Sequence, residues 1–159
     1  MSNIKTHSHH VIIYTDGSCQ GNPGPGGWAA VLICNGATKK IAGFQDHTTN
    51  NQMELQGAIE GLKSLTRNCS VELFTDSQYV KKGITEWIEG WIAKNWRNSA
   101  NKPVKNQEFW EELYSLSKQH QISWNWVKGH STDPLNNEAD RLATLAASLQ
   151  RPLTLDELN

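Results

Sequence analysis

The sequence predicts a mixed α/β domain of three layers, in which a five-stranded sheet with three antiparallel first strands carries helices on both faces. Three apolar, β-branched segments separated by glycine-containing turns come first, as in an antiparallel meander. Two further short strands then alternate with amphipathic helical segments. The length of 159 residues fits one domain with a substantial core, and no internal repeat or linker divides it.

Composition predicts an ordinary cytoplasmic protein. The net charge is -1 with both signs mixed, which leaves room for a nucleic-acid partner if the basic residues form a local patch. The three cysteines are odd in number and lack zinc-type spacing, so we expect reduced thiols. No signal peptide and no run of 18 apolar residues occurs, which predicts neither export nor a membrane span. We expect a monomer, and the sequence indicates no protein partner.

The first strand ends in an acid. The segment 11–18 runs through β-branched residues to Asp16 and then to a glycine, as at the end of a buried strand. The loop 17–27 is rich in glycine and proline. Its end fits the dinucleotide pattern G-x-G-x-x-A, but the residues that follow, 28–33, have a strand pattern where that motif needs a helix. A third strand is expected over 38–46.

A helix follows, with a second acid near its start. Its apolar face is formed by residues spaced three or four apart: Leu55, Ile59, Leu62 and Leu65. Asn51 is the expected N-cap, and Glu54 then occupies the capping-box position. Glu54 is therefore either a capping residue or a functional acid, and its position alone does not decide between them.

The strand 71–75 repeats the pattern of the first strand. Asp16 and Asp76 each follow a threonine and precede a small residue. Asp76 by itself is readily explained as a helix cap. If the two strands are adjacent and parallel, however, both carboxylates leave the sheet at the same edge, where open α/β sheets bind ligands.

The second half of the chain adds helices, a basic segment and a fourth acid. Helices are expected over 80–91 and 109–116, a strand over 122–127, and a last helix that begins at Asp133 and Pro134. The irregular segment 94–105 holds four basic residues and no acid. Asp140 lies beside the apolar stripe of the last helix. Loose tails are expected at 1–9 and 151–159, although the histidines near the N-terminus also allow a metal-binding role.

Four acids at the ends of elements, without a Cys or His ligand set, suit a cation that prefers oxygen. Mg²⁺ is the natural choice, and two such ions can cleave a phosphodiester with an activated water. Clustered acids repel one another without a metal, so clustering points to one. His130 lies in a glycine-containing loop and is either a mobile proton carrier or a simple exposed side chain. Trp87 and Trp91, near the basic segment, either stack on nucleic acid or form a small core.

The residues together resemble bacterial type 1 ribonuclease H. The resemblance covers roughly residues 10–150 and rests on the order and spacing of five stretches: YTDGSCQGNPGPGG, TTNNQMEL, FTDSQYV, KPVKN and WVKGH. It implies an endonuclease that cuts the RNA strand of RNA–DNA hybrids with Mg²⁺, or Mn²⁺ as a substitute, and leaves 3′-hydroxyl and 5′-phosphate ends.

The resemblance also implies residue roles. Four acids match the metal-binding and catalytic carboxylates of the family, namely Asp16, Glu54, Asp76 and Asp140, and His130 matches its proton-transfer histidine. Five residues match positions that contact the minor groove and RNA 2′-hydroxyls: Cys19, Asn22, Asn50, Asn51 and Gln78. Thr49 and Asn106 match a pocket for a DNA phosphate, and Trp87 and Trp110 a channel for the DNA strand. The segment from about 87 to 105 matches a basic substrate-binding protrusion.

Two departures from close relatives concern charge. An arginine of the phosphate pocket is replaced by His47, and the protrusion contains Glu89, Ile92 and Ala93 where relatives are more basic. We therefore expect the hybrid to bind more weakly, with an affinity that falls less steeply as the salt concentration rises. Rival interpretations are a junction resolvase or integrase core, a hybrid-binding module without activity, and a structural domain whose acids are all caps.

Overall fold

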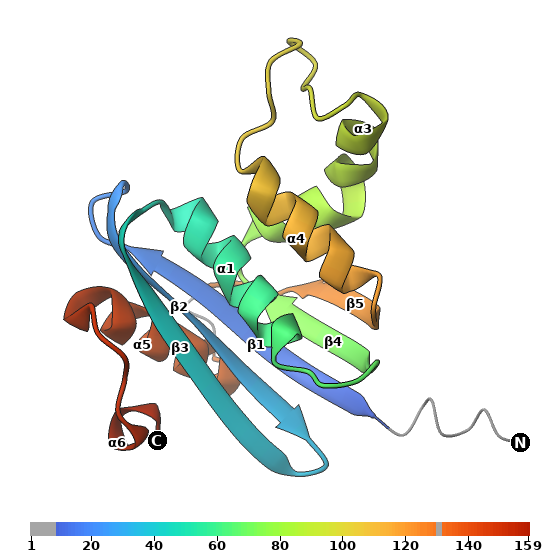
Figure 1. Cartoon of the computed structure of the whole chain (residues 1–159). Coiled ribbons are helices and arrows are strands. Elements are labelled where there is room, and N and C mark those ends of the chain that lie inside the picture. The colour runs from blue at the N-terminus through green and yellow to red at the C-terminus, as the bar shows by residue number, and fades with distance from the viewer. Residues whose placement is uncertain (1–8, 130–131) are drawn as a thin grey trace, which may run out of the picture.

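The computed structural model of the protein describes residues 9–129 and 132–159 (Figure 1). Within them, one five-stranded sheet has the order β3-β2-β1-β4-β5. The strands are β1 (His10–Cys19), β2 (Gly24–Cys34), β3 (Ala37–Thr48), β4 (Ser70–Thr75) and β5 (Gln121–Trp126). β1, β2 and β3 pair antiparallel, whereas β4 is parallel to both β1 and β5. The predicted fold class and strand arrangement are confirmed.

The helices lie on both faces of this sheet. They are α1 (Asn50–Lys63), α2 (Gln78–Lys82), the π-helical segment η2 (Gly83–Trp87), α3 (Ile88–Ala93), α4 (Gln107–Ser117), α5 (Pro134–Leu149) and α6 (Leu155–Leu158). α1 and α4 cover one face and α5 covers the other (Figure 1). The helix expected over 80–91 is thus part of a longer helical run with a π-helical centre. No helix among the described residues is both long and apolar enough to cross a membrane.

Strand alternation divides the core into two clusters. On β1, Ile13 packs with Leu55 of α1, whereas the next residue, Tyr14, packs with Leu142 of α5. This follows because successive side chains of a strand point to opposite faces of the sheet. Both faces of β1 are therefore buried, and Asp16 belongs to the most enclosed strand of the sheet.

Two helix starts were predicted, and one of them was wrong. Asp133 caps α5 as expected, because its side chain accepts a hydrogen bond from the backbone N–H of Leu135 at 3.0 Å and Pro134 opens the helix. α1 is capped by Thr49 rather than Asn51, because Thr49 keeps an extended backbone and accepts from the N–H of Gln52. Asn51 is already in the first helical turn, so Glu54 does not occupy a capping-box position.

The C-terminal residues were expected to form a loose tail, and the structure corrects this. Thr154 and Glu157 form a reciprocal capping box that starts α6, and Arg151 pairs with Glu157 at 2.8 Å. Leu153 and Leu158 pack against the cluster beneath α5. This burial of apolar area explains why a polar segment is ordered. Of the expected N-terminal tail, residues 1–8 lie outside the described residues, and His9 accepts a hydrogen bond from Arg67 at 3.0 Å.

Candidate active site

Parallel pairing of β1 and β4 brings two acids to one edge of the sheet. Thr15 lies opposite Thr75 in the register, and both threonines are fully buried. The residue that follows each threonine is an aspartate, within β1 for Asp16 and directly after β4 for Asp76, so the two acids emerge side by side. Asp16 is only 2% exposed, and its Oδ1 accepts a hydrogen bond from the N–H of Gly17 at 2.9 Å.

Glu54 reaches the same place from α1. The helix lies directly on β1, since a Cβ added to Gly57 would come within 2.8 Å of the carbonyl oxygen of Asp16. Glu54 is 7% exposed, and its Oε1 is a buried atom without a hydrogen-bond partner in the described part of the chain. Leaving a buried carboxylate oxygen unpaired is costly, so this oxygen is suited to binding a cation.

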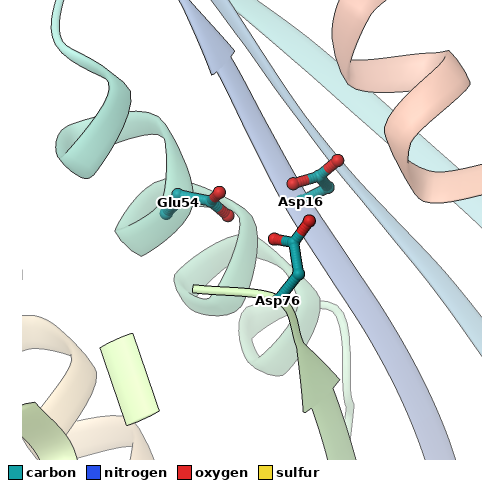
Figure 2. Close-up of side chains that lie close together, drawn as sticks. All are labelled: Asp16, Glu54 and Asp76. Atoms are coloured by element: carbon teal, nitrogen blue, oxygen red, sulfur yellow. The ribbon is translucent and has the colours of Figure 1, made fainter. Parts of the chain in front are cut away.

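Asp16, Glu54 and Asp76 each place one carboxylate oxygen within 4.8 Å of the other two (Figure 2). Burial is the largest cause of a raised pKa for all three carboxyls. Burial and the charges of Asp76 and Asp140 raise the pKa of Asp16 to about 9, and burial and the two neighbouring aspartates raise the pKa of Glu54 well above its usual range. A group of acids in this state favours either protons or a divalent cation.

Of the two remaining predicted catalytic residues, Asp140 lies near the cluster and His130 is not among the residues that the structure describes. Asp140 is half-buried on α5 and lies outside the group of three, but it is near enough to Asp16 to help raise the pKa of that carboxyl. His130 lies outside the described residues. The neighbouring Gly129 is against the site, because a Cβ built there would be 3.1 Å from Oδ2 of Asp76.

The residues predicted to face the RNA lie around the loop between β1 and β2 and the start of α1. Asn22 accepts a hydrogen bond through Oδ1 from the backbone N–H of Asn50 at 2.9 Å. The thiol of Cys19 donates to the carbonyl of Thr48 at 3.3 Å, and Asn51 is exposed in the first turn of α1. Four of the five thus lie near one another, while Gln78 is exposed at the start of α2.

One predicted contact residue of the DNA channel is wrong. Trp110 is fully buried, and its ring packs so closely on Gly83 that any Cβ there would overlap it. It is a core residue and has no surface for a substrate. Trp87 is 38% exposed and remains a candidate, whereas Trp91 is half-buried among the rings of Trp87, Trp96 and Trp110.

Two residues that the sequence did not single out join the site to the protrusion. Gln52 donates through Nε2 to Oδ1 of Asn106 at 3.1 Å, and Nδ2 of Asn106 donates to the hydroxyl of Tyr79 at 3.1 Å. Both lie inside recognised stretches, Gln52 in TTNNQMEL and Tyr79 in FTDSQYV. The periodicity of apolar residues did not indicate either residue. Their hydrogen bonds join α1 and α2 to the start of α4, and such bonds depend on how the helices pack.

Comparison with known proteins identifies the family. The RNase H family model matches residues 8–148. Ribonuclease H of Hahella chejuensis is 58% identical over 135 residues, which are 85% of this chain and 91% of the relative. Ribonuclease H of Xanthomonas oryzae pv. oryzae is 53% identical over 141 residues, or 89% of this chain and 94% of the relative. The crystal structure of LC9-RNase H1, a type 1 RNase H with the type 2 active-site motif, is similar with a TM-score of 0.82 and 29% identity, over 91% of this chain and 75% of that one. The chain therefore belongs to the ribonuclease H family, among its bacterial type 1 members.

Proposed function

We propose that the protein is an endonuclease that hydrolyses the RNA strand of RNA–DNA hybrids with two divalent metal ions and leaves 3′-hydroxyl and 5′-phosphate ends. The observation that carries this proposal is the cluster of Asp16, Glu54 and Asp76 at one edge of the sheet, with Asp140 against Asp16. Neither a binding module nor a structural domain gains from three acids held so close together.

The residues present fit a hard divalent cation. All donors in the cluster are carboxylate oxygens, which suit Mg²⁺ and Mn²⁺. The unpartnered Oε1 of Glu54 would gain a ligand, and the like charges that raise the three pKa values would be neutralised. When bound, two such ions supply an activated water and stabilise charge on the leaving oxygen.

Each residue has a role in this proposal. Asp16, Glu54, Asp76 and Asp140 would hold the two ions: Asp16 would contribute to both metal sites, Glu54 and Asp76 would complete one, and Asp140 would help to hold the other. Thr15 and Thr75 are buried opposite each other in the β1–β4 register, which brings the aspartates that follow them to the same edge of the sheet. His130 would carry a proton during cleavage or product release.

Substrate recognition is proposed on the surface that surrounds the cluster. Polar side chains contact the minor groove and the RNA 2′-hydroxyls, which distinguish RNA from DNA. They are Cys19, Asn22, Asn50 and Asn51 near the β1–β2 loop and the start of α1, together with Gln78 at the start of α2. Thr49 and Asn106 bind a DNA phosphate. Trp87 and the exposed basic residues between 94 and 105 contact the DNA strand.

The test is a cleavage assay with RNA–DNA hybrid, duplex RNA and duplex DNA, each with Mg²⁺ and with EDTA. We expect cleavage of the RNA in the hybrid alone, and only with metal. Asp16→Asn should lower the rate at least about 10³-fold, because metal stabilisation of transition-state charge contributes several kcal/mol. Circular dichroism should show an unchanged fold. Full activity of this variant in Mg²⁺ would refute the assignment, and cleavage of all-DNA substrates would favour the resolvase or integrase interpretation.

A further inference from the structure

A continuous hydrogen-bond chain connects α1, α4 and α2. Thr48 donates through its hydroxyl to Oε1 of Gln52 at 2.8 Å, and Gln52 donates through Nε2 to Oδ1 of Asn106 at 3.1 Å. Asn106 donates through Nδ2 to the hydroxyl oxygen of Tyr79 at 3.1 Å, and the indole N–H of Trp110 donates to the same oxygen at 3.0 Å. Both ends of the chain are fixed in the protein, since Thr48 is 3% exposed and Trp110 is fully buried.

The hydrogen bonds of this chain hold the Asn106 amide with its oxygen towards Gln52 and its nitrogen towards Tyr79. An indole N–H can only donate, so the Tyr79 oxygen must accept from Trp110 and accepts a second bond from Asn106. A side-chain amide has one carbonyl oxygen and two N–H groups. Within the described residues, Gln52 bonds the oxygen and Tyr79 one N–H, which leaves the second N–H of Asn106 for a ligand.

The backbone conformation of Asn106 explains why its amide is directed towards α1. Asn106 is the N-cap of α4 in the left-handed conformation, with φ 62° and ψ 31°, and its side chain makes no capping bond to its own helix. Side chains at this cap position normally bond the first helical turn. The amide is instead directed across to the start of α1, where Gln52 lies one turn inside the helix that Thr49 caps. The two helix starts are thereby held together in the described structure.

We propose that Gln52 and Tyr79 are positioning residues that hold the Asn106 amide with its free N–H directed at a phosphate of the DNA strand. The inference rests on the proposed function, because it gives Asn106 its phosphate. Gln52 and Tyr79 need not touch the substrate themselves. Their contribution is to remove the freedom of the amide to rotate or to cap its own helix, so that less conformational entropy is lost when the hybrid binds.

A double-mutant cycle tests this. Gln52→Leu should raise the KM for hybrid about 2- to 12-fold with kcat unchanged, since a net hydrogen bond is worth about 0.5–1.5 kcal/mol and uniform binding affects KM alone. Tyr79→Phe, which keeps the ring against Trp110, should act in the same direction. Asn106→Ala should raise KM at least as much, and adding Gln52→Leu to it should have no further effect. If the two effects multiply, Gln52 acts independently and the proposal is overturned.

Gln56→Leu is the matched control, because Gln56 lies one turn later on α1 and, among the described residues, its side chain bonds Glu60 rather than Asn106. It should leave KM unchanged. A second measurement does not depend on activity: the side-chain amide resonances of Asn106 in nitrogen-15 NMR spectra. They should shift in Gln52→Leu and Tyr79→Phe but not in Gln56→Leu, and unchanged resonances in the first two would refute the positioning role. A wild-type protein that cuts no hybrid would refute the proposed function instead, while these spectra would still test the hydrogen-bond chain.

Discussion

Gly17 lies directly against the backbone of Glu54. A Cβ at Gly17 would overlap the peptide group that joins Met53 to Glu54, so only a residue without a side chain allows α1 to approach β1 this closely. Asp16 and Glu54 are on different elements, and the carboxylate cluster exists because of this approach. The distance between strand and helix therefore controls the geometry of the proposed active site.

Gly17→Ala should damage both stability and activity. Inserting a methyl group into a tightly packed interface typically costs about 1–3 kcal/mol. The rate of hybrid cleavage should fall by up to about 100-fold, because a displacement of about 1 Å in a catalytic group has effects of that size. Urea denaturation and single-turnover cleavage measure the two losses.

Gly90→Ala provides the matched stability control. Gly90 lies in α3 with nothing within 4 Å of the position of a new Cβ. This substitution should raise the free energy of unfolding by about 0.5–1 kcal/mol through helix propensity. Equal destabilisation by the two alanines would contradict the packing argument.

The metal-free protein should lose stability as pH rises. Asp16 has a folded-state pKa of about 9 against a usual value of 3.8, so between these values the folded chain binds a proton that the unfolded chain has released. The free energy of unfolding therefore decreases from about pH 4 towards pH 9. The raised pKa of Glu54 acts in the same direction. Urea denaturation in EDTA across this range measures the slope, which Asp16→Asn should make shallower. An identical slope in the variant would contradict this prediction.

Mg²⁺ should stabilise the folded protein. A cation that binds only the folded state adds about 2.7 kcal/mol to the free energy of unfolding at 100 times its dissociation constant. Sodium chloride at matched ionic strength controls for screening of surface charge. Asp16→Asn should lose most of the stabilisation in thermal denaturation, and Mn²⁺ should replace Mg²⁺. Equal stabilisation of wild type and variant would place the ion elsewhere.

His47→Arg should strengthen binding of the hybrid at neutral pH. His47 is exposed on β3, close in sequence to the Thr49 cap, and arginine remains charged throughout the accessible pH range. One added phosphate contact should make the slope of log affinity against log salt steeper by about 0.9. Binding titrations of an uncleaved hybrid in Ca²⁺ at several salt concentrations measure both changes. An unchanged slope would show that residue 47 makes no phosphate contact.

Much of the architecture was predictable because it depends on local patterns. Alternating apolar residues indicated the strands of the meander, and Asp133-Pro134 indicated the start of α5, since capping is decided within a few residues. The repeated Thr-Asp at 15–16 and 75–76 predicted the paired aspartates once the strands were taken as parallel neighbours. Trp110 was assigned to the DNA channel from the resemblance alone, and its burial could not be anticipated because it depends on packing against Gly83 of a distant segment.

The sequence by itself determined the five strands, the main helices, the acids at their ends and the family to which the chain belongs. The tertiary structure decided which of those acids meet: Asp16, Glu54 and Asp76 within 4.8 Å, with Asp140 beside them. It also decided that Thr49 caps α1, that residues 155–158 form a helix, and that Gln52 and Tyr79 hold Asn106. The physical reason is the distance along the chain over which each interaction acts. Periodicity and capping act over a few residues, whereas the approach of a helix to a strand is set by packing between segments far apart in the chain.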